Sequence, residues 1–220
     1  MRKRVSLGLV MMTLLLTACG AKPVPNGVVP TSLQTIEAAA EDIIDFIPGG
    51  NWERINTDVT SITEAWQSYL AQAANDGAPQ DVQDSMAAAL SQIEAAAAAQ
   101  DAAVTWQSAN DISAAIVELY ALYNPVIPAD IGRLDVLERQ VILDVAANDY
   151  TAAATSLDKV KAVWENVKPS VLAHDGQDAS AQFEASLAAQ ESALTAQDKT
   201  TLTNEATNGL EIVDVLERLY

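Results

Sequence analysis

Apolar residues recur at spacings of three and four along most of the chain, a pattern typical of amphipathic helices. A clear stretch in the first half contains Ile55, Val59, Ile62 and Trp66. Residues 153–167 repeat the same spacing in the second half. No segment shows the alternation of a half-buried strand, and alanine, the best helix former, is abundant throughout. The pattern therefore predicts an all-α fold.

Prolines, glycines and capping residues divide this pattern into helices. Thr31-Ser32, after Pro30, and Asp130, after Pro128, are the expected N-caps of the first helix in each half. Pro48-Gly49-Gly50 is expected to end the first of these helices. The second helix of each half is expected at residues 52–75 and 150–173, each closed by an Asp-Gly turn.

The remaining segments, residues 79–123 and 177–220, are too long for single helices of a compact domain. Each exceeds 40 residues without an internal proline, which corresponds to roughly 65 Å of straight helix at 1.5 Å per residue. We expect a break in each. It falls either near Gln100-Asp101 or near Ser108 to Asp111, where the second half carries Gly209.

The two halves of the chain align with each other, which predicts an internal repeat. A shift of 98 residues places Trp66 on Trp164, and after the Asp-Gly turns a shift of 97 places Tyr123 on Tyr220. The expected organisation is a signal peptide at 1–18, a flexible tether at 19–29, repeat 1 at 30–123, a linker at 124–127 and repeat 2 at 128–220. Six to eight antiparallel helices would then form one pseudo-symmetric bundle or two bundles side by side.

Charge limits the partners of this domain. The chain has 12 Lys and Arg against 30 Asp and Glu, and loss of the three basic residues at its start would leave a formal charge of about −21. Such a charge disfavours binding to nucleic acid. Cys19 is the single cysteine, so a disulfide within the chain is excluded.

The N-terminal 22 residues carry the signals of an exported protein. A basic start, Arg2 to Arg4, precedes an apolar run from Val5 to Leu16 that is shorter than the ~20 residues of a membrane-spanning helix. The following Leu16-Thr17-Ala18-Cys19 resembles the lipobox of bacterial prolipoproteins. The alternatives are an ordinary signal peptide with an incidental cysteine, or a thiol that pairs with another chain.

The lipobox resemblance implies a membrane anchor. In that family the cysteine thiol receives diacylglycerol, cleavage precedes the cysteine, and the new amine is usually acylated, often with palmitate. Two or more acyl chains anchor a protein stably, so Cys19 is the expected lipidation site. Sorting rules of the enterobacterial members make Gly20 favour the outer membrane, facing the periplasm, over the outer face of the cytoplasmic membrane.

Two sets of residues are candidates for binding. One is a polar cluster on the first helix of the second half, interpreted either as two exposed helical ion pairs or as a recognition face that the first half lacks. It consists of Asp130, Arg133, Asp135, Glu138 and Arg139. The other is Trp106, Tyr120 and Tyr123, a place for an apolar ligand or a partner helix, because Trp106 and Tyr120 have no aromatic counterpart in the second half. Trp66 and Trp164 are expected in the core.

The sequence offers little for catalysis or metal binding. The one histidine, His174, lies at a predicted turn, and no nucleophile elbow, phosphate loop or Ca²⁺ loop is present. We therefore expect no enzymatic activity, no cofactor and no metal site. The first hypothesis is a membrane-anchored binding or adaptor protein with an envelope protein as partner, and the alternative is a periplasmic carrier of a cation or small ligand.

Overall fold

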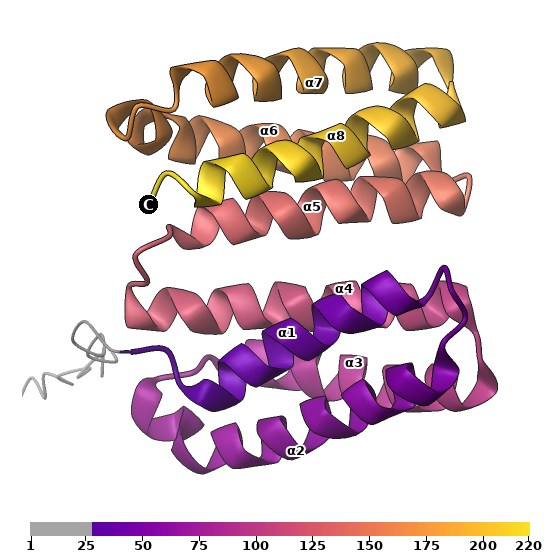
Figure 1. The fold of residues 1–220 in the computed structure, drawn as a ribbon, viewed down its shortest axis with the longest axis vertical. Coiled ribbons are helices and arrows are strands. Elements are labelled where there is room, and N and C mark those ends of the chain that lie inside the picture. Colours follow the sequence, from indigo (N-terminus) through magenta and orange to yellow (C-terminus); the bar gives the residue numbers. More distant parts are fainter. Residues whose placement is uncertain (1–27) are drawn as a thin grey trace, which may run out of the picture.

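The computed structural model of the chain describes residues 28–220, which are helical apart from short connections. These residues form eight α-helices and no strand. The helices pack on one another (Figure 1). The predicted all-α fold is therefore confirmed. The helices are α1 (Thr31–Phe46), α2 (Trp52–Asp76), α3 (Gln80–Ala99), α4 (Ala102–Tyr120), α5 (Ala129–Ala146), α6 (Tyr150–Ala173), α7 (Gln177–Ala196) and α8 (Lys199–Glu217), with a 3-10 turn η1 (Ala121–Tyr123) after α4.

The helices form two antiparallel sets of four that lie side by side. We call α1 to α4 the first set and α5 to α8 the second set. Figure 1 shows α4 running next to α5 along the boundary between the sets, which we call the seam. Helices α1 and α8, one from each set, make little contact with each other across the same boundary. The seam is therefore closed along α4 and α5 and more open between α1 and α8.

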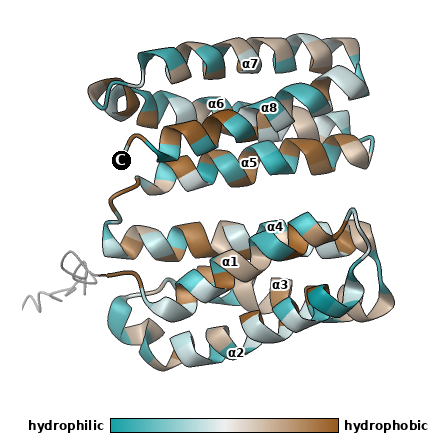
Figure 2. Ribbon diagram, in the orientation of Figure 1, coloured by the Kyte–Doolittle hydropathy of each residue, from teal (hydrophilic) through white to brown (hydrophobic). Residues whose placement is uncertain are grey.

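Each set has its own hydrophobic core. Trp66 in the first core is 2% exposed, and Trp164 in the second is 1% exposed, as expected for both. Figure 2 shows hydrophobic and hydrophilic residues alternating along each helix, which is the pattern that lets four helices bury a shared face. Trp106 is an exception, since it belongs to α4 but packs against the second core.

The two sets correspond helix by helix. Helices α3 and α7 have 20 residues each, α4 and α8 have 19 each, and α2 and α6 have 25 and 24. This agreement is what the predicted repeat requires. The expected linker at 124–127 lies between η1 and α5, where the chain passes from one set to the other.

The break in each long segment lies at Gln100-Asp101 and at Gln197-Asp198. Gln100 and Gln197 adopt left-handed backbone conformations with φ of 57° and 51°, which end α3 and α7. The next residue, Asp101 or Asp198, then accepts a hydrogen bond from the backbone of the following helix and caps it. The alternative break near Ser108 to Asp111 and Gly209 is wrong, because these residues lie inside α4 and α8.

The first helix of each set begins differently from the prediction. Pro30 and Pro128 occupy the N-cap positions of α1 and α5, and neither helix has a side-chain cap. Thr31-Ser32 and Asp130 are thus wrong as N-caps. Asp130 lies in the first turn of α5, where its carboxylate binds Arg133 instead of a backbone N–H. A proline at the cap fixes the entry of the chain without supplying a capping oxygen.

We predict that Gly176→Ala destabilises the second set. An added Cβ would lie 2.5 Å from a methyl group of Val171, 2.6 Å from one of Leu219 and 2.8 Å from the backbone oxygen of Val171. Since backbone cannot yield cheaply, we expect a loss of about 1–3 kcal/mol of unfolding free energy in urea titrations. Gly49→Ala is the control, since the nearest atom to its Cβ is 3.7 Å away. Equal effects of the two changes would contradict this packing.

Candidate functional site

A network of buried and partly buried polar side chains joins α4 to α5 across the seam. Gln107 and Gln140 exchange two amide hydrogen bonds of 2.8 and 3.1 Å. Asn110 donates to the Val136 carbonyl at 3.2 Å, and its oxygen accepts from Arg139 Nη1 at 3.3 Å. Because unpaired polar groups are costly to bury, these bonds fix how the two sets are aligned.

The predicted polar cluster on α5 takes part in this alignment. Both expected ion pairs form, Asp130 with Arg133 at 2.6 Å and Asp135 with Arg139 at 2.5 Å. Arg133 also binds Glu118 of α4 with two nitrogens, at 2.7 and 2.8 Å, which lowers the pKa of Glu118. The interpretation as two exposed pairs is wrong, because Arg139 is only 8% exposed and faces α4.

Glu138, the remaining member of that cluster, lies inside the second core. It is 0% exposed, and its Oε1 accepts a 3.1 Å hydrogen bond from Gln190 of α7. An added Cβ at Gly209 of α8 would lie 2.6 Å from Glu138 Oε1, so the glycine makes room for the carboxyl group. Burial, partly offset by the Gln190 bond, raises the pKa of Glu138 to about 8.

Two oxygen atoms of the Glu138–Gln190 pair lack a hydrogen-bond partner, and the protonation state of Glu138 bears on this. Glu138 Oε2 and Gln190 Oε1 are both buried acceptors without a hydrogen-bond donor. A proton on Oε2 would turn that atom into a donor, so the neutral acid leaves fewer buried acceptors unpaired. Burial beside Gln190 therefore favours the neutral form of Glu138.

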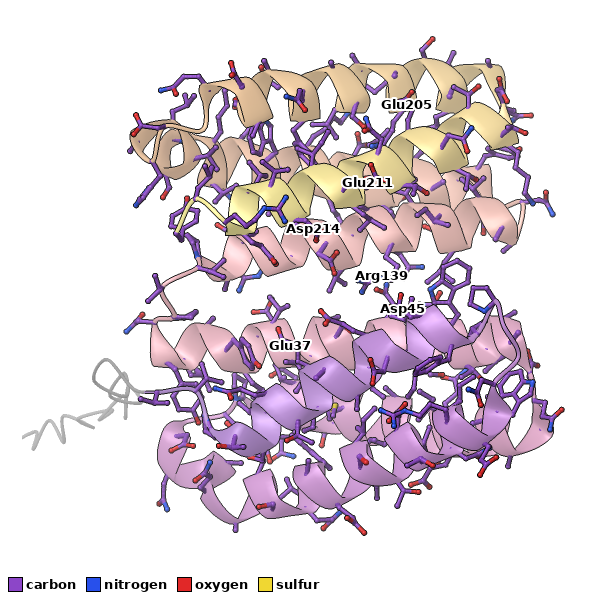
Figure 3. The ribbon with its side chains drawn as sticks, viewed as in Figure 1. Glu37, Asp45, Arg139, Glu205, Glu211 and Asp214 are labelled. Carbon is purple, nitrogen blue, oxygen red and sulfur yellow. The ribbon has the colours of Figure 1, made fainter. Side chains whose placement is uncertain are left out.

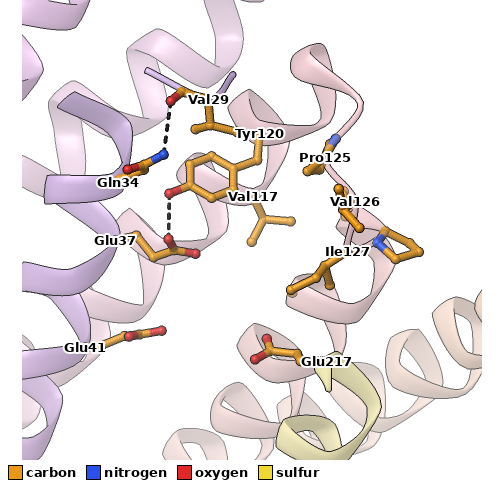
Figure 4. Close-up of a pocket in the computed structure, with 13 residues that line it drawn as sticks. Val29, Gln34, Glu37, Glu41, Val117, Tyr120, Pro125, Val126, Ile127 and Glu217 are labelled. Atoms are coloured by element: carbon orange, nitrogen blue, oxygen red, sulfur yellow. Dashed lines mark hydrogen bonds between the residues drawn. The ribbon is translucent and has the colours of Figure 1, made fainter. Parts of the chain in front are cut away.

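A groove of about 520 Å³ opens at the end of the seam where the chain passes between the sets. Figure 4 shows α1 on one side, the α4–α5 connection on the other and Glu217 of α8 opposite α1. Its apolar wall includes Val117, Val126 and Ile127, and Val126 is 79% exposed. Val29, just before α1, also lines the groove, and its carbonyl accepts a 3.1 Å bond from Gln34.

Three glutamates provide the charge of this groove. Glu37 and Glu41 belong to α1 and Glu217 to α8, and no arginine or lysine lines the groove. Figure 3 shows Glu37 on the first set and Arg139 on the second at the seam. Tyr120 donates a 2.5 Å hydrogen bond to Glu37. The groove thus combines negative charge with an apolar wall.

The glutamates interact electrostatically with one another. Partial burial, followed by repulsion from Glu37 and Asp135, raises the pKa of Glu41 to about 7, although Arg139 opposes this shift. Burial is also the main cause that raises the pKa of Glu37 and of Glu217. The charge of Glu37 acts on both of the other carboxyl groups, so the three share one electrostatic environment.

The predicted aromatic candidates do not gather in one place. Tyr120 lines the groove, whereas Trp106 packs against the second core. Tyr123 is 3% exposed, and its hydroxyl donates to Asp76 of α2 and lies 3.5 Å from that of Tyr69. The expected groove around all three residues is therefore wrong, and only Tyr120 is in a position to touch a ligand there.

The charged residues of the groove escaped the sequence prediction, although the repeat held a signal for them. Tyr120 of the first half aligns with Glu217 of the second, and both line the groove. Glu41 aligns with Arg139, and the two act on each other across the seam. Positions where the copies differ thus mark the surface between the sets.

The described part of the chain contains no preformed metal site. Among residues 28–220, no three His, Cys, Asp or Glu side chains are grouped to hold a metal ion. His174 lies exposed after α6 and packs against the ring of Tyr220 in a tilted arrangement, with ring centres 4.4 Å apart.

None of the helices in residues 28–220 has both the length and the apolar character needed to cross a bilayer. Cys19, the predicted lipidation site, lies outside the described residues. A scan against protein-family models, a search of curated proteins and a search of solved structures each gave no match to the chain.

We predict that Glu138→Gln removes a pH dependence of stability. The folded protein keeps Glu138 protonated up to about pH 8, whereas the unfolded chain ionises it near 4.5. Raising the pH through this window therefore favours the unfolded state of the wild type, by up to about 5 kcal/mol. The glutamine keeps the Gln190 hydrogen bond but cannot ionise, so the variant should lose less stability between pH 5 and 8.

Urea unfolding followed by circular dichroism at these two pH values measures the difference. The control is Glu211→Gln, which makes the same substitution at an exposed position of α8 and should follow the wild type. If Glu138→Gln loses as much stability as the wild type between pH 5 and 8, Glu138 is not a neutral acid in the core.

Proposed function

We propose that this chain is a lipid-anchored binding protein of the bacterial cell envelope that works without catalysis and holds its partner in the groove between the two sets. The observation that carries the proposal is the groove itself. Both sets and their connection contribute to its walls, and it offers carboxylates, a tyrosine and apolar side chains together. This mixture is typical of a site that orients a ligand.

The place of the groove fits an anchored protein. Val29 lines it, so the chain enters the first set at the groove. Val29 is ten positions after Cys19 in the sequence, which limits the distance between a lipid on Cys19 and the groove to about 35 Å. A partner would therefore bind close to the bilayer. Since Gly20 favours the outer membrane under the enterobacterial sorting rules, this would be on its periplasmic side.

The polar cluster of α5 is less suited to recognise a partner. Arg133 and Arg139 already bind Glu118, Asp130, Asp135 and Asn110 within the protein. A partner would have to break these bonds, and the seam would lose its alignment. The exposed Val126 and Ile127 of the connection need no such rearrangement.

We predict that Cys19→Ala abolishes lipidation. The chain has no other cysteine, so no other thiol can accept a diacylglycerol group. Cells grown with radioactive palmitate should label the wild type and the control variant Ala21→Ser, which lies after the lipobox. The Cys19→Ala protein should remain unlabelled and unprocessed. Palmitate label on that variant would refute the anchor.

We predict that a photo-crosslinking amino acid at Val126 forms a specific adduct in intact cells. Val126 is 79% exposed at the groove, whereas the control position Leu172, 38% exposed on α6, lies outside it. Immunoblots should show a discrete adduct of one size at position 126 and none at 172. Absence of any adduct at Val126, or the same adduct at both positions, would contradict the groove as the docking surface for a protein partner.

A further inference from the structure

The charge of the groove is not balanced within the protein. Glu37, Glu41 and Glu217 form none of the ion pairs found among residues 28–220. Arg139 acts on Glu41, but its guanidinium already binds Asp135 and Asn110. Arg218 acts on Glu217 but forms none of these ion pairs. An occupant of the groove therefore gains most if it brings positive charge.

The shape of the groove selects among cations. Its glutamates come from both sides of the seam, and the apolar side chains of Val117, Val126 and Ile127 lie between α1 and α5. A compact metal ion would find no group of three ligands among the described residues. An elongated cation with methylene groups between its charges can reach glutamates on both sides while its carbon chain covers the apolar wall.

The volume agrees with such an occupant. About 520 Å³ lies within the range of roughly 300–1,000 Å³ that is typical of small-molecule sites. The ring of Tyr120 also faces the groove in Figure 4, and an aromatic face attracts ammonium groups. The three features, carboxylates without ion-pair partners, an apolar wall and a half-buried aromatic ring that lines the groove, converge on one chemical class.

We propose that the groove binds a linear aliphatic polyamine, with ammonium groups at Glu41 and Glu217 and the methylene chain against Val126 and Ile127. The inference rests on the proposed binding function and names the ligand class for the same groove. It favours the carrier form of that function, in which the protein holds a small cation near the bilayer.

The test is isothermal titration calorimetry of the full-length, detergent-solubilised protein with spermidine. Glu41→Gln and Glu217→Gln should each weaken binding about five- to tenfold, because each removes a carboxylate that faces an ammonium group. Glu211→Gln removes the same charge from an exposed position of α8 outside the groove, so it should change the affinity less than twofold. Ile127→Ser should weaken binding without changing the charge.

Two further probes separate shape from charge. Mg²⁺ has the charge but not the methylene chain, and 1,8-octanediol has the chain but not the charge. Neither should displace spermidine at equal concentration. Displacement by Mg²⁺, or an equal loss of affinity in Glu211→Gln and Glu217→Gln, would reduce the binding to general electrostatic attraction and overturn the inference.

Proton release gives an independent readout. Glu41, which faces Glu37 of its own helix, Asp135 and Arg139 of α5 and Glu217 of α8, is partly protonated at pH 7. A bound ammonium group favours the ionised form, so binding should release protons and the measured heat should depend on the buffer. Glu41→Gln should reduce this dependence. No dependence in the wild type would place the cation elsewhere.

The outcome for the ligand class is separable from that for the groove. If spermidine does not bind while Val126 still forms its adduct in cells, the polyamine inference fails and the groove remains the binding surface. If neither is observed, the binding function fails as well.

Discussion

The arrangement of this protein depends on the need to satisfy polar groups buried between two hydrophobic cores. Each set of four helices has its own core, and Trp106 of α4 is the large side chain that crosses from the first set to pack against the second core. The alignment of the sets also depends on the bonds of Gln107, Asn110, Gln140 and Arg139, which have partners only when α4 and α5 are in one alignment. Such bonds add modest free energy but strongly disfavour other alignments. The groove exists because this alignment leaves α1 and α8 apart.

Much of the fold follows from local signals in the sequence. The spacing of Trp66 and Trp164 within apolar stripes placed both in a core, and α6 has the expected bounds, because helical periodicity and strong stop signals act over short distances. The N-cap predictions were wrong because Pro30 and Pro128 occupy the cap positions themselves. Thr31 and Asp130 therefore lie inside α1 and α5. The break at Gln100 was one of two alternatives, since a glutamine in the left-handed region has no strong sequence signature.

The functional surface was harder to predict because its parts are distant in sequence. Glu138 is charged and looked like a surface residue, and only Gly209 and Gln190, brought beside it by the fold, explain why it is buried. Glu37 and Glu217 are almost a whole domain apart along the chain yet act on each other. The repeat carried a usable hint, since Glu41 and Tyr120 differ in character from their counterparts Arg139 and Glu217. Positions that differ between the two repeats thus pointed to the groove, whereas positions that they share pointed to the cores.

An even number of helices in each set brings the start of α1, the connection from η1 to α5 and the end of α8 to the same end of the molecule, as Figure 1 shows. The two sets are thus joined covalently at this end, through residues 124–128 beside the groove. The two hydrogen bonds between Gln107 and Gln140 lie further along α4 and α5. If these hydrogen bonds broke and the two sets rotated about the connection, the sets would separate most at the far end of the molecule. The groove walls beside the connection would move least. The groove therefore lies where such an opening would change its shape least.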